Sequence, residues 1–187
     1  MKNSIYIFIL CVFVGLVSCK KETLPTHQLV AIRNLYTLEL PARFEPTYDM
    51  HESAELQYAD KTTHWYLICV EDAKSNFGTG SPKAVSLPDY YKFAEAAVLS
   101  EAESKLFLQG VTRKQDGLKI QEGDYQVHTT IQEESYELLY RVTILESKTH
   151  FFQLVMWMPY EEGCAVYQKM DSITRTFKLI SNEDSKT

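Results

Sequence analysis

Two stretches of the chain are apolar on both faces of an extended strand, and they restrict the fold more than any other part of the sequence. They are Trp65-Tyr66-Leu67-Ile68-Cys69-Val70 and Phe151-Phe152-Gln153-Leu154-Val155-Met156-Trp157-Met158. Successive side chains of a strand point to opposite faces of its sheet, so a strand that is apolar on both faces must be covered on both sides. The chain therefore predicts a sheet with these two strands in its interior.

Four further strands are predicted around them. Residues 125–131 and 136–144 alternate apolar and polar side chains, which indicates one buried and one wet face, with Arg141 and Thr143 on the wet side. A strand over 35–40 stops at Pro41. Residues 55–59 join the first central strand through a polar turn, as in a hairpin. The pattern is typical of a mainly antiparallel sheet.

The first helix is predicted from its start signal. Ser86 suits an N-cap, Pro88 the first turn and Asp89 the capping-box position. Ser100 with Glu103 could cap a second start. The segment from Leu87 to Gln109 is therefore compatible with one helix ending near Gly110 or with two shorter helices, and strands are expected beyond Gly110.

The last helix is predicted by spacing. After Pro159, apolar residues recur at intervals of four, three, four and three: Val166, Met170, Ile173, Phe177 and Ile180. Such a stripe packs on a sheet. The order of strands, helix, strands and helix predicts an α+β fold, an α/β/α sandwich with a mainly antiparallel sheet flanked by helices. One domain over 34–180 is expected, and 45% hydrophobic residues suffice for its core.

The N-terminus reads as an export signal. Lys2 is followed by an apolar run of about 12 residues, too short for the roughly 20 that span a bilayer. Leu16-Val17-Ser18-Cys19 resembles the lipobox of bacterial lipoproteins, which implies a signal peptide over 1–18 and a lipid on Cys19. An uncleaved signal anchor and an ordinary cleaved signal are the alternatives.

Residues 19–33 are expected to form the lipidated cysteine and a tether that reaches on the order of 40 Å, and residues 181–187 a polar tail. No Asp follows Cys19. By the lipoprotein resemblance, this favours the outer membrane of a bacterial cell envelope, with the face left open.

The net charge of the chain limits the classes of partner that it is expected to bind. The formal net charge is −6, and it becomes −7 when residues 1–18 take Lys2 away and the Cys19 amine is acylated. This balance argues against nucleic acid and against binding to anionic lipid heads. The expected membrane contact is the lipid on Cys19, and the expected partner is an envelope protein or a small ligand.

Two cysteines remain once Cys11 leaves with the signal and Cys19 carries lipid. In an exported protein, these two cysteines, Cys69 and Cys164, could form a disulfide. A buried free thiol is the alternative for each, because sequence does not supply the Cα separation that a disulfide needs.

The domain resembles the PsbP/DcrB-like lipoproteins in a pattern of short segments. They are Tyr36-Thr37-Leu38-Glu39-Leu40-Pro41, Leu56-Gln57-Tyr58, Leu87-Pro88-Asp89-Tyr90-Tyr91, Phe151 to Trp157, and Ile173-Thr174-Arg175-Thr176-Phe177-Lys178. The family's usual closing motif is Ser-Phe-Lys, where this chain has Thr176-Phe177-Lys178. The resemblance implies an α/β/α sandwich and roles in binding and assembly, with no common catalytic residues. A fold alone does not transfer a function.

One candidate metal site can be assembled from the sequence. His51-Glu52-Ser53-Ala54-Glu55 matches the first half of a zincin motif, with Glu55 in place of the second His. His51, Glu55 and His64 could together hold a metal for an envelope hydrolase. The alternative, which the polar composition favours, is an exposed turn and edge strand with no metal.

The function expected from these observations is a non-enzymatic, membrane-anchored binding or assembly module without a cofactor. Tyrosines outside the core could form a ligand-binding face. The candidates are Tyr48, Tyr58, Tyr90, Tyr91 and Tyr160. The metal-dependent hydrolase is the alternative, and a purely structural role in a larger assembly is a third.

Overall fold

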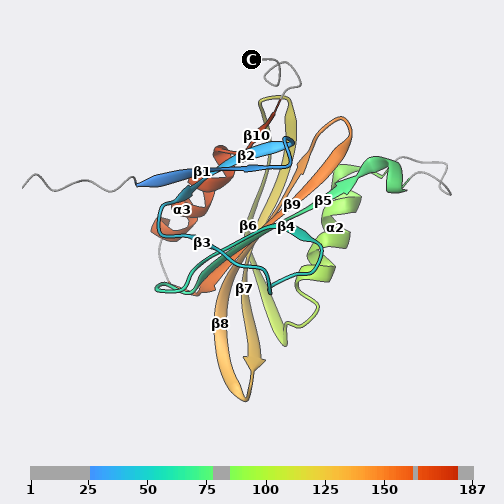
Figure 1. Ribbon diagram of the computed structural model, residues 1–187. Coiled ribbons are helices and arrows are strands. Elements are labelled where there is room, and N and C mark those ends of the chain that lie inside the picture. The colour runs from blue at the N-terminus through green and yellow to red at the C-terminus, as the bar shows by residue number, and fades with distance from the viewer. Residues whose placement is uncertain (1–25, 78–84, 162–163, 181–187) are drawn as a thin grey trace, which may run out of the picture.

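The computed structural model describes residues 26–77, 85–161 and 164–180 (Figure 1). The predicted signal peptide, Cys19 and the polar tail lie outside the described residues. None of the helices in the described ranges is both long and apolar enough to cross a membrane.

A seven-stranded antiparallel sheet forms the centre of the molecule. Its order is β3 (Glu45–Pro46), β4 (Ala54–Asp60), β5 (Trp65–Ala73), β9 (His150–Pro159), β8 (Glu134–Glu146), β7 (Leu118–Ile131) and β6 (Ser104–Gln115). The two strands predicted to be central, β5 and β9, are neighbours in its interior. The hairpin between β4 and β5 is also confirmed.

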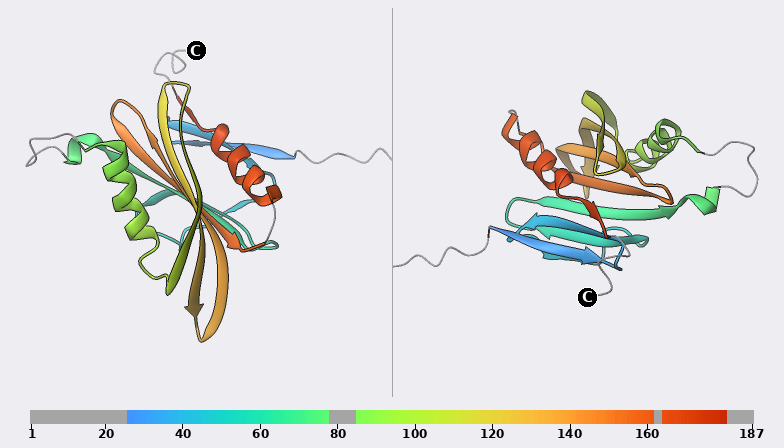
Figure 2. Two further views of the ribbon diagram at one scale, coloured as in Figure 1. Left: turned by 180° about the vertical axis from the view of Figure 1, so that it is seen from behind. Right: turned by 90° about the horizontal axis from the view of Figure 1, so that it is seen from above.

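One face of this sheet is covered by a second sheet and a helix. The small sheet has the order β1 (His27–Ile32), β2 (Tyr36–Pro41) and β10 (Lys178–Leu179), and the helix is α3 (Cys164–Arg175). The views in Figure 2 show both on the same side of the large sheet. Tyr36 of β2 stacks on Phe177 with ring centroids 4.7 Å apart, and Phe152 of β9 lies 5.3 Å from Tyr36, so the layers meet in an aromatic core.

The predicted tether is too long, because residues 27–32 pair with β2 as strand β1. Val30 is buried in the main core. The Gln28 side chain donates to the carbonyls of Pro41 and Phe44 at 3.3 and 2.6 Å. These contacts fix a segment that lacks a clear sequence period, and the domain therefore begins before residue 34.

The opposite face carries α2 (Leu87–Val98). Ser86 is its N-cap, as predicted: the Ser86 Oγ accepts from the Asp89 backbone N–H at 3.3 Å. The helix packs Leu87, Tyr90, Tyr91 and Ala94 onto β7, β8 and β9. It ends at Leu99, whose N–H bonds the Glu95 carbonyl at 3.0 Å.

Neither helix prediction for the segment up to Gln109 is right, because β6 begins at Ser104 and Gly110 lies in its middle. A two-residue turn explains the strand. Asp116 and Gly117 have φ of 49° and 81°, the left-handed values of the hairpin turn that Asp-Gly favours. This turn pairs the whole of β6 with β7.

The last helix follows the predicted stripe, since Val166, Met170 and Ile173 of α3 and Phe177 beyond it are buried in the main core. Layers of helix, central sheet, and helix with small sheet confirm the predicted α+β class. The prediction of a solvent-exposed face is wrong for Arg141 and Thr143 of β8. They are buried, because α3 and the small sheet cover that side.

The β7–β8 hairpin reaches beyond the covering layers (Figure 1). Near its tip the side chains of Ile131 and Tyr136 are 52% and 39% exposed. The alternating pattern predicted a buried face along both strands, and that prediction fails at the tip because no element lies over it in the described part of the chain.

Candidate functional site

The predicted metal residues are not brought together. Glu55 lies near the start of β4 and forms an ion pair with Arg33 at 2.5 Å. His64 lies in the turn at the far end of β4, roughly 17 Å along the strand. The His51 Nδ1 accepts from the Ser53 N–H at 3.2 Å. Within the described ranges no three His, Cys, Asp or Glu side chains are placed to hold a metal ion, so the alternative metal site of His51, Glu55 and His64 is not assembled.

Cys69 is a free thiol, fully buried on β5 in the main core. Burial raises its pKa to about 12. Of the two alternatives that the sequence leaves open for Cys69, a disulfide to Cys164 or a buried free thiol, the structure shows the buried free thiol.

The five candidate tyrosines do not form one face. Tyr48 is 82% exposed, whereas Tyr90 and Tyr91 belong to α2 and are buried between that helix and the sheet. The Tyr90 hydroxyl donates to the Asp72 carboxylate. Of the five, Tyr91 reaches a cavity, where it meets Tyr125 of β7, which sequence reasoning did not single out.

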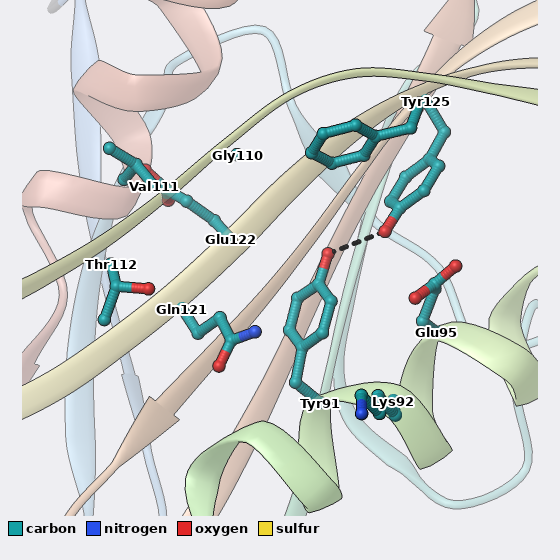
Figure 3. A pocket seen from close by; sticks show the side chains of 10 residues that line it. Tyr91, Lys92, Glu95, Gly110, Val111, Thr112, Gln121, Glu122 and Tyr125 are labelled. Carbon is teal, nitrogen blue, oxygen red and sulfur yellow. Dashed lines mark hydrogen bonds between the residues drawn. The ribbon is translucent and has the colours of Figure 1, made fainter.

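This cavity, the α2-side pocket, lies between α2 and the edge of the sheet and encloses about 470 Å³ (Figure 3). Helix α2 supplies one wall, and β6 and β7 supply the floor. Its lining residues are Tyr91, Lys92, Glu95, Phe107, Gly110, Val111, Thr112, Gln121, Glu122 and Tyr125.

Two tyrosines form the inner end of the α2-side pocket. Their hydroxyls are hydrogen-bonded at 3.0 Å, as the dashed line in Figure 3 marks. Burial raises the pKa of Tyr91, and its bond to Tyr125 raises it further. Burial likewise raises the pKa of Tyr125. Both hydroxyls therefore stay protonated at neutral pH and act as hydrogen-bond donors and acceptors, not as bases.

The charged and aromatic rim of this pocket comes from β6 and α2. Lys105 binds Glu95 at 3.0 Å and lies 6.0 Å from the Tyr125 ring centroid. Phe107 meets the same ring edge to face at 5.5 Å, and its side chain is 58% exposed. Lys92 makes no ion pair with any described residue. The rim thus offers an exposed aromatic ring from β6 and, on α2, a cation that has no ion pair among the described residues.

The pocket has its depth because two glycines face each other across the hairpin. Gly110 of β6 pairs with Gly123 of β7. A Cβ on Gly123 would come closer than 3.0 Å to the Tyr91 hydroxyl. Glycine is required here for space, and its absent side chain lets Tyr91 lie against the strand.

A second cavity, the α3-side pocket, lies on the other face of the same two strands. It encloses about 300 Å³ between the sheet and α3. Its lining residues are Gln109, Gly110, Val111, Arg113, Glu122, Gly123, Asp124, Arg141, Tyr167, Gln168, Asp171 and Arg175.

The wall of the α3-side pocket is a buried ionic network. Arg141 donates to Asp124 from Nε at 2.6 Å and from Nη2 at 2.8 Å. Gln109 of β6 donates to the same carboxylate at 2.7 Å. Arg113 donates to Glu122. Burial opposes the charge of Arg141, but the bonds and charge of Asp124 outweigh it and raise the pKa of the guanidinium. These charges are mutually neutralised, which suits a fixed framework.

The two pockets are back to back. Gly110, Val111 and Glu122 line both, and alternate side chains of β6 and β7 divide between them. Both open beside β6, the last strand of the sheet. The arrangement can recognise a bound group by hydrogen bonds, an aromatic contact and charge on two faces of one edge.

Sequence carried one unused signal for this site. Asp116-Gly117 is a strong hairpin signature, and it would have placed β6 against β7 and Gly110 opposite Gly123. No pattern in the sequence indicates that Tyr91 meets Tyr125, since that contact depends on how α2 packs on the sheet. Asp124 meets Arg141 because the two lie directly opposite each other in the β7–β8 ladder, so that contact depends on the register of the hairpin.

The comparisons with known proteins bear on the fold. No protein-family model matches the sequence, and no curated protein does. Among solved structures, cyanobacterial PsbP (CyanoP) from Synechocystis is similar with a TM-score of 0.57 at 13% identity, over 88% of this chain and 98% of that one. The Ran-binding protein Mog1p of Saccharomyces cerevisiae gives a TM-score of 0.59 at 13% identity, over 84% and 97%.

A third similar structure is LpqN, involved in cell envelope biogenesis of Mycobacterium tuberculosis, with a TM-score of 0.51 at 10% identity over 83% of this chain and 91% of that one. At such identities the similarity shows the fold alone. In its described residues the chain has mainly antiparallel sheets and the α-helices α2 and α3, in a PsbP/Mog1-like α+β fold, and the PsbP part of the resemblance seen in the sequence is confirmed at that level.

Proposed function

We propose that the chain is a lipoprotein of the bacterial cell envelope, held at the outer membrane by lipid on Cys19, whose domain is a non-catalytic binding module. The observation that carries this proposal is the pair of back-to-back pockets at the β6 edge. Their tyrosine hydroxyls stay protonated, and their carboxylates are already engaged by Arg, Lys or Gln. Such a site is better suited to binding a ligand than to catalysing a reaction.

The structural neighbours support the proposal in a limited way. LpqN is described as involved in cell envelope biogenesis and Mog1p as a Ran-binding protein. Both descriptions fit a fold used for binding and assembly. The lipid anchor itself is supported by the Leu16-Val17-Ser18-Cys19 sequence.

The anchor is tested by mass spectrometry of the chain purified from membranes. Cleavage before Cys19 and acyl groups on that cysteine are expected, and Cys19→Ala should release the chain from the outer-membrane fraction. A chain that stays membrane-bound as Cys19→Ala would contradict the lipid anchor.

The binding role is tested by crosslinked capture from native membranes. We compare the wild type with Cys19→Ala, with Thr112→Trp, which fills the α2-side pocket from its exposed rim, and with Thr112→Val, which keeps the size of the side chain. A protein or small molecule recovered with the wild type and Thr112→Val, but lost with Thr112→Trp, supports the proposal. Catalytic turnover by the purified chain that disappears in Thr112→Trp would refute the non-catalytic role.

A further inference from the structure

Strand β6 is an unusual edge. It is 12 residues long, it hydrogen-bonds only to β7, and nothing in the described residues pairs with its outer side. Leu106, Phe107 and Val111 on it are 59%, 58% and 47% exposed. A long edge strand with apolar side chains is a template for the backbone of another chain.

The register shows which backbone groups are free. The two-residue turn Asp116-Gly117 is closed by the pair Gln115 and Leu118, which is hydrogen-bonded in such turns. Hydrogen-bonded and non-hydrogen-bonded pairs then alternate along the ladder. Gly110, Thr112 and Lys114 therefore direct their N–H and C=O groups away from β7, toward a strand that would lie alongside.

The two pockets fit the side chains of such a strand. Residues paired across an antiparallel ladder place their side chains on the same face, and successive residues alternate between faces. A residue opposite Gly110 would point into the α2-side pocket, where Gly110 leaves the room of a missing side chain. Its neighbour would point into the α3-side pocket beside Gln109 and Val111. One extended segment thus occupies both cavities.

Charge indicates the composition of that segment. Strand β6 carries Lys105, Arg113 and Lys114 and no carboxylate, although the whole chain has a net charge of −6. Lys114 lies directly opposite Lys119 of β7. Lys119 binds Glu146 at 3.2 Å, whereas Lys114 has no ion pair among the described residues. Lys105 and Arg113 are paired with Glu95 and Glu122, so Lys114 is the charge on β6 that has no ion pair among the described residues and can attract a carboxylate.

The same charges disfavour a second copy of this chain as the occupant. Antiparallel pairing of two β6 strands along their full length would bring Lys105 of one copy close to Lys114 of the other. Like charges facing each other across a ladder destabilise it. A carboxylate-bearing segment gains from the same positions.

We propose that β6 accepts an extended, acidic segment of a partner protein as an added eighth strand, with successive side chains in the α2-side and α3-side pockets. This inference rests on the proposed binding function and names its partner class. Backbone hydrogen bonds provide affinity in such complexes, and pockets for alternate side chains provide selectivity.

The test uses the full-length chain in detergent and two pools of fluorescent nine-residue peptides. Both pools carry randomised Val, Thr, Tyr or Phe at alternate positions. The remaining positions are Asp or Glu in one pool and Lys or Arg in the other. Fluorescence anisotropy should show binding of the acidic pool alone, weakened by added salt. Failure of both pools to bind, or equal binding of both, overturns the proposal.

Backbone pairing is tested on the tightest acidic peptide. N-methylation at alternate residues along one edge should reduce affinity about tenfold or more, whereas methylation along the other edge should change it little. Equal effects of the two methylation patterns overturn strand addition. On the protein, Thr112→Pro removes an outward N–H without removing a bond to β7, and Thr112→Val is its matched control.

Lys114→Glu should weaken the acidic peptide about fivefold or more, and unchanged binding there contradicts the charge argument. The two proposals fail separately. If membrane capture depends on Thr112 but no acidic peptide binds, the binding function stands and the strand-addition inference falls.

Discussion

Gly123 provides the sharpest test of how the α2-side pocket is built. In Gly123→Ala the new methyl group would lie less than 3.0 Å from the Tyr91 hydroxyl, and the next nearest atoms, of Tyr125, are 3.2 Å away. Gly123 shows no left-handed φ, so the backbone itself accepts alanine. The substitution therefore acts through the contact with Tyr91.

The expected magnitude follows from three contributions. Overpacking that pushes a buried ring away costs about 1–3 kcal/mol. Loss of the Tyr91–Tyr125 hydrogen bond costs about 1 kcal/mol. Replacing a strand glycine by alanine returns about 0.5–1 kcal/mol. We expect Gly123→Ala to lower the free energy of unfolding by about 1–3 kcal/mol.

A double-mutant cycle separates this contact from other effects. Tyr91→Phe alone should cost about 1 kcal/mol, because it removes the hydroxyl and its bond to Tyr125. In the Tyr91→Phe background the alanine methyl takes the vacated space, so Gly123→Ala should cost about nothing. The coupling measured by urea denaturation should be about 1–3 kcal/mol.

Gly110→Ala is the matched control, because its Cβ would meet the exposed Phe107 ring, 3.0 Å away, which can move, and the Glu122 backbone oxygen at 3.1 Å, but not the Tyr91 hydroxyl. Its cost should be below about 1 kcal/mol. If the two changes at 91 and 123 are additive within about 0.5 kcal/mol, glycine at 123 does not exist to accommodate the Tyr91 hydroxyl.

Three further results are expected. Asp124→Ala leaves the buried Arg141 without its ion-pair partner and should destabilise the fold by about 3–5 kcal/mol in urea titrations. Part of this loss should be recovered in Asp124→Ala/Arg141→Met. Equal losses in both variants would argue against an uncompensated charge. Burial opposes ionisation of Asp60 and Glu146, but hydrogen bonds from Thr63 and Lys74 and nearby cations hold the pKa of each below its ordinary 3.8 and 4.5. The stability that the two carboxylates contribute is therefore present above those values and is lost as pH falls through the lower folded pKa. The melting temperature should drop in acid, and it should drop less in Asp60→Asn. An identical acid profile in that variant would contradict the direction of the pKa shift. Cys69, with its pKa raised to about 12, should resist iodoacetamide at pH 8 until urea unfolds the chain, as read by peptide mass spectrometry, and rapid native labelling would mean that the thiol is accessible.

The interior of the sheet could be predicted because β5 and β9 are apolar at nearly every position, which leaves a strand no exposed face. The edge strand β6 was missed, although Asp116-Gly117 signals the hairpin that contains it. Leu106-Phe107-Leu108 is apolar without alternation, and the bulge between Phe107 and Gln109 breaks the period that would have identified a strand. Its exposure comes from having no neighbour, which is a property of the assembled sheet.

The candidate site was missed for a related reason. Arg141 alternates with apolar residues and so reads as solvent-facing, yet it is 4% exposed because α3 and the small sheet cover that face. Periodicity reports the polarity of each side of a strand. It does not report which side of the strand another layer will cover, or that Asp124 will neutralise the charge of Arg141.

The pairing of β1 with β2 has a consequence for an anchored chain. With residues 27–32 in the domain, the tether runs only from Cys19 to His27. Fully extended it would span about 28 Å, which is shorter than first expected. If Cys19 carries lipid as proposed, the β6 edge samples a small volume above the membrane, at an effective concentration on the order of millimolar toward a partner fixed nearby. A segment that binds the free domain only in the micromolar range would then be bound most of the time.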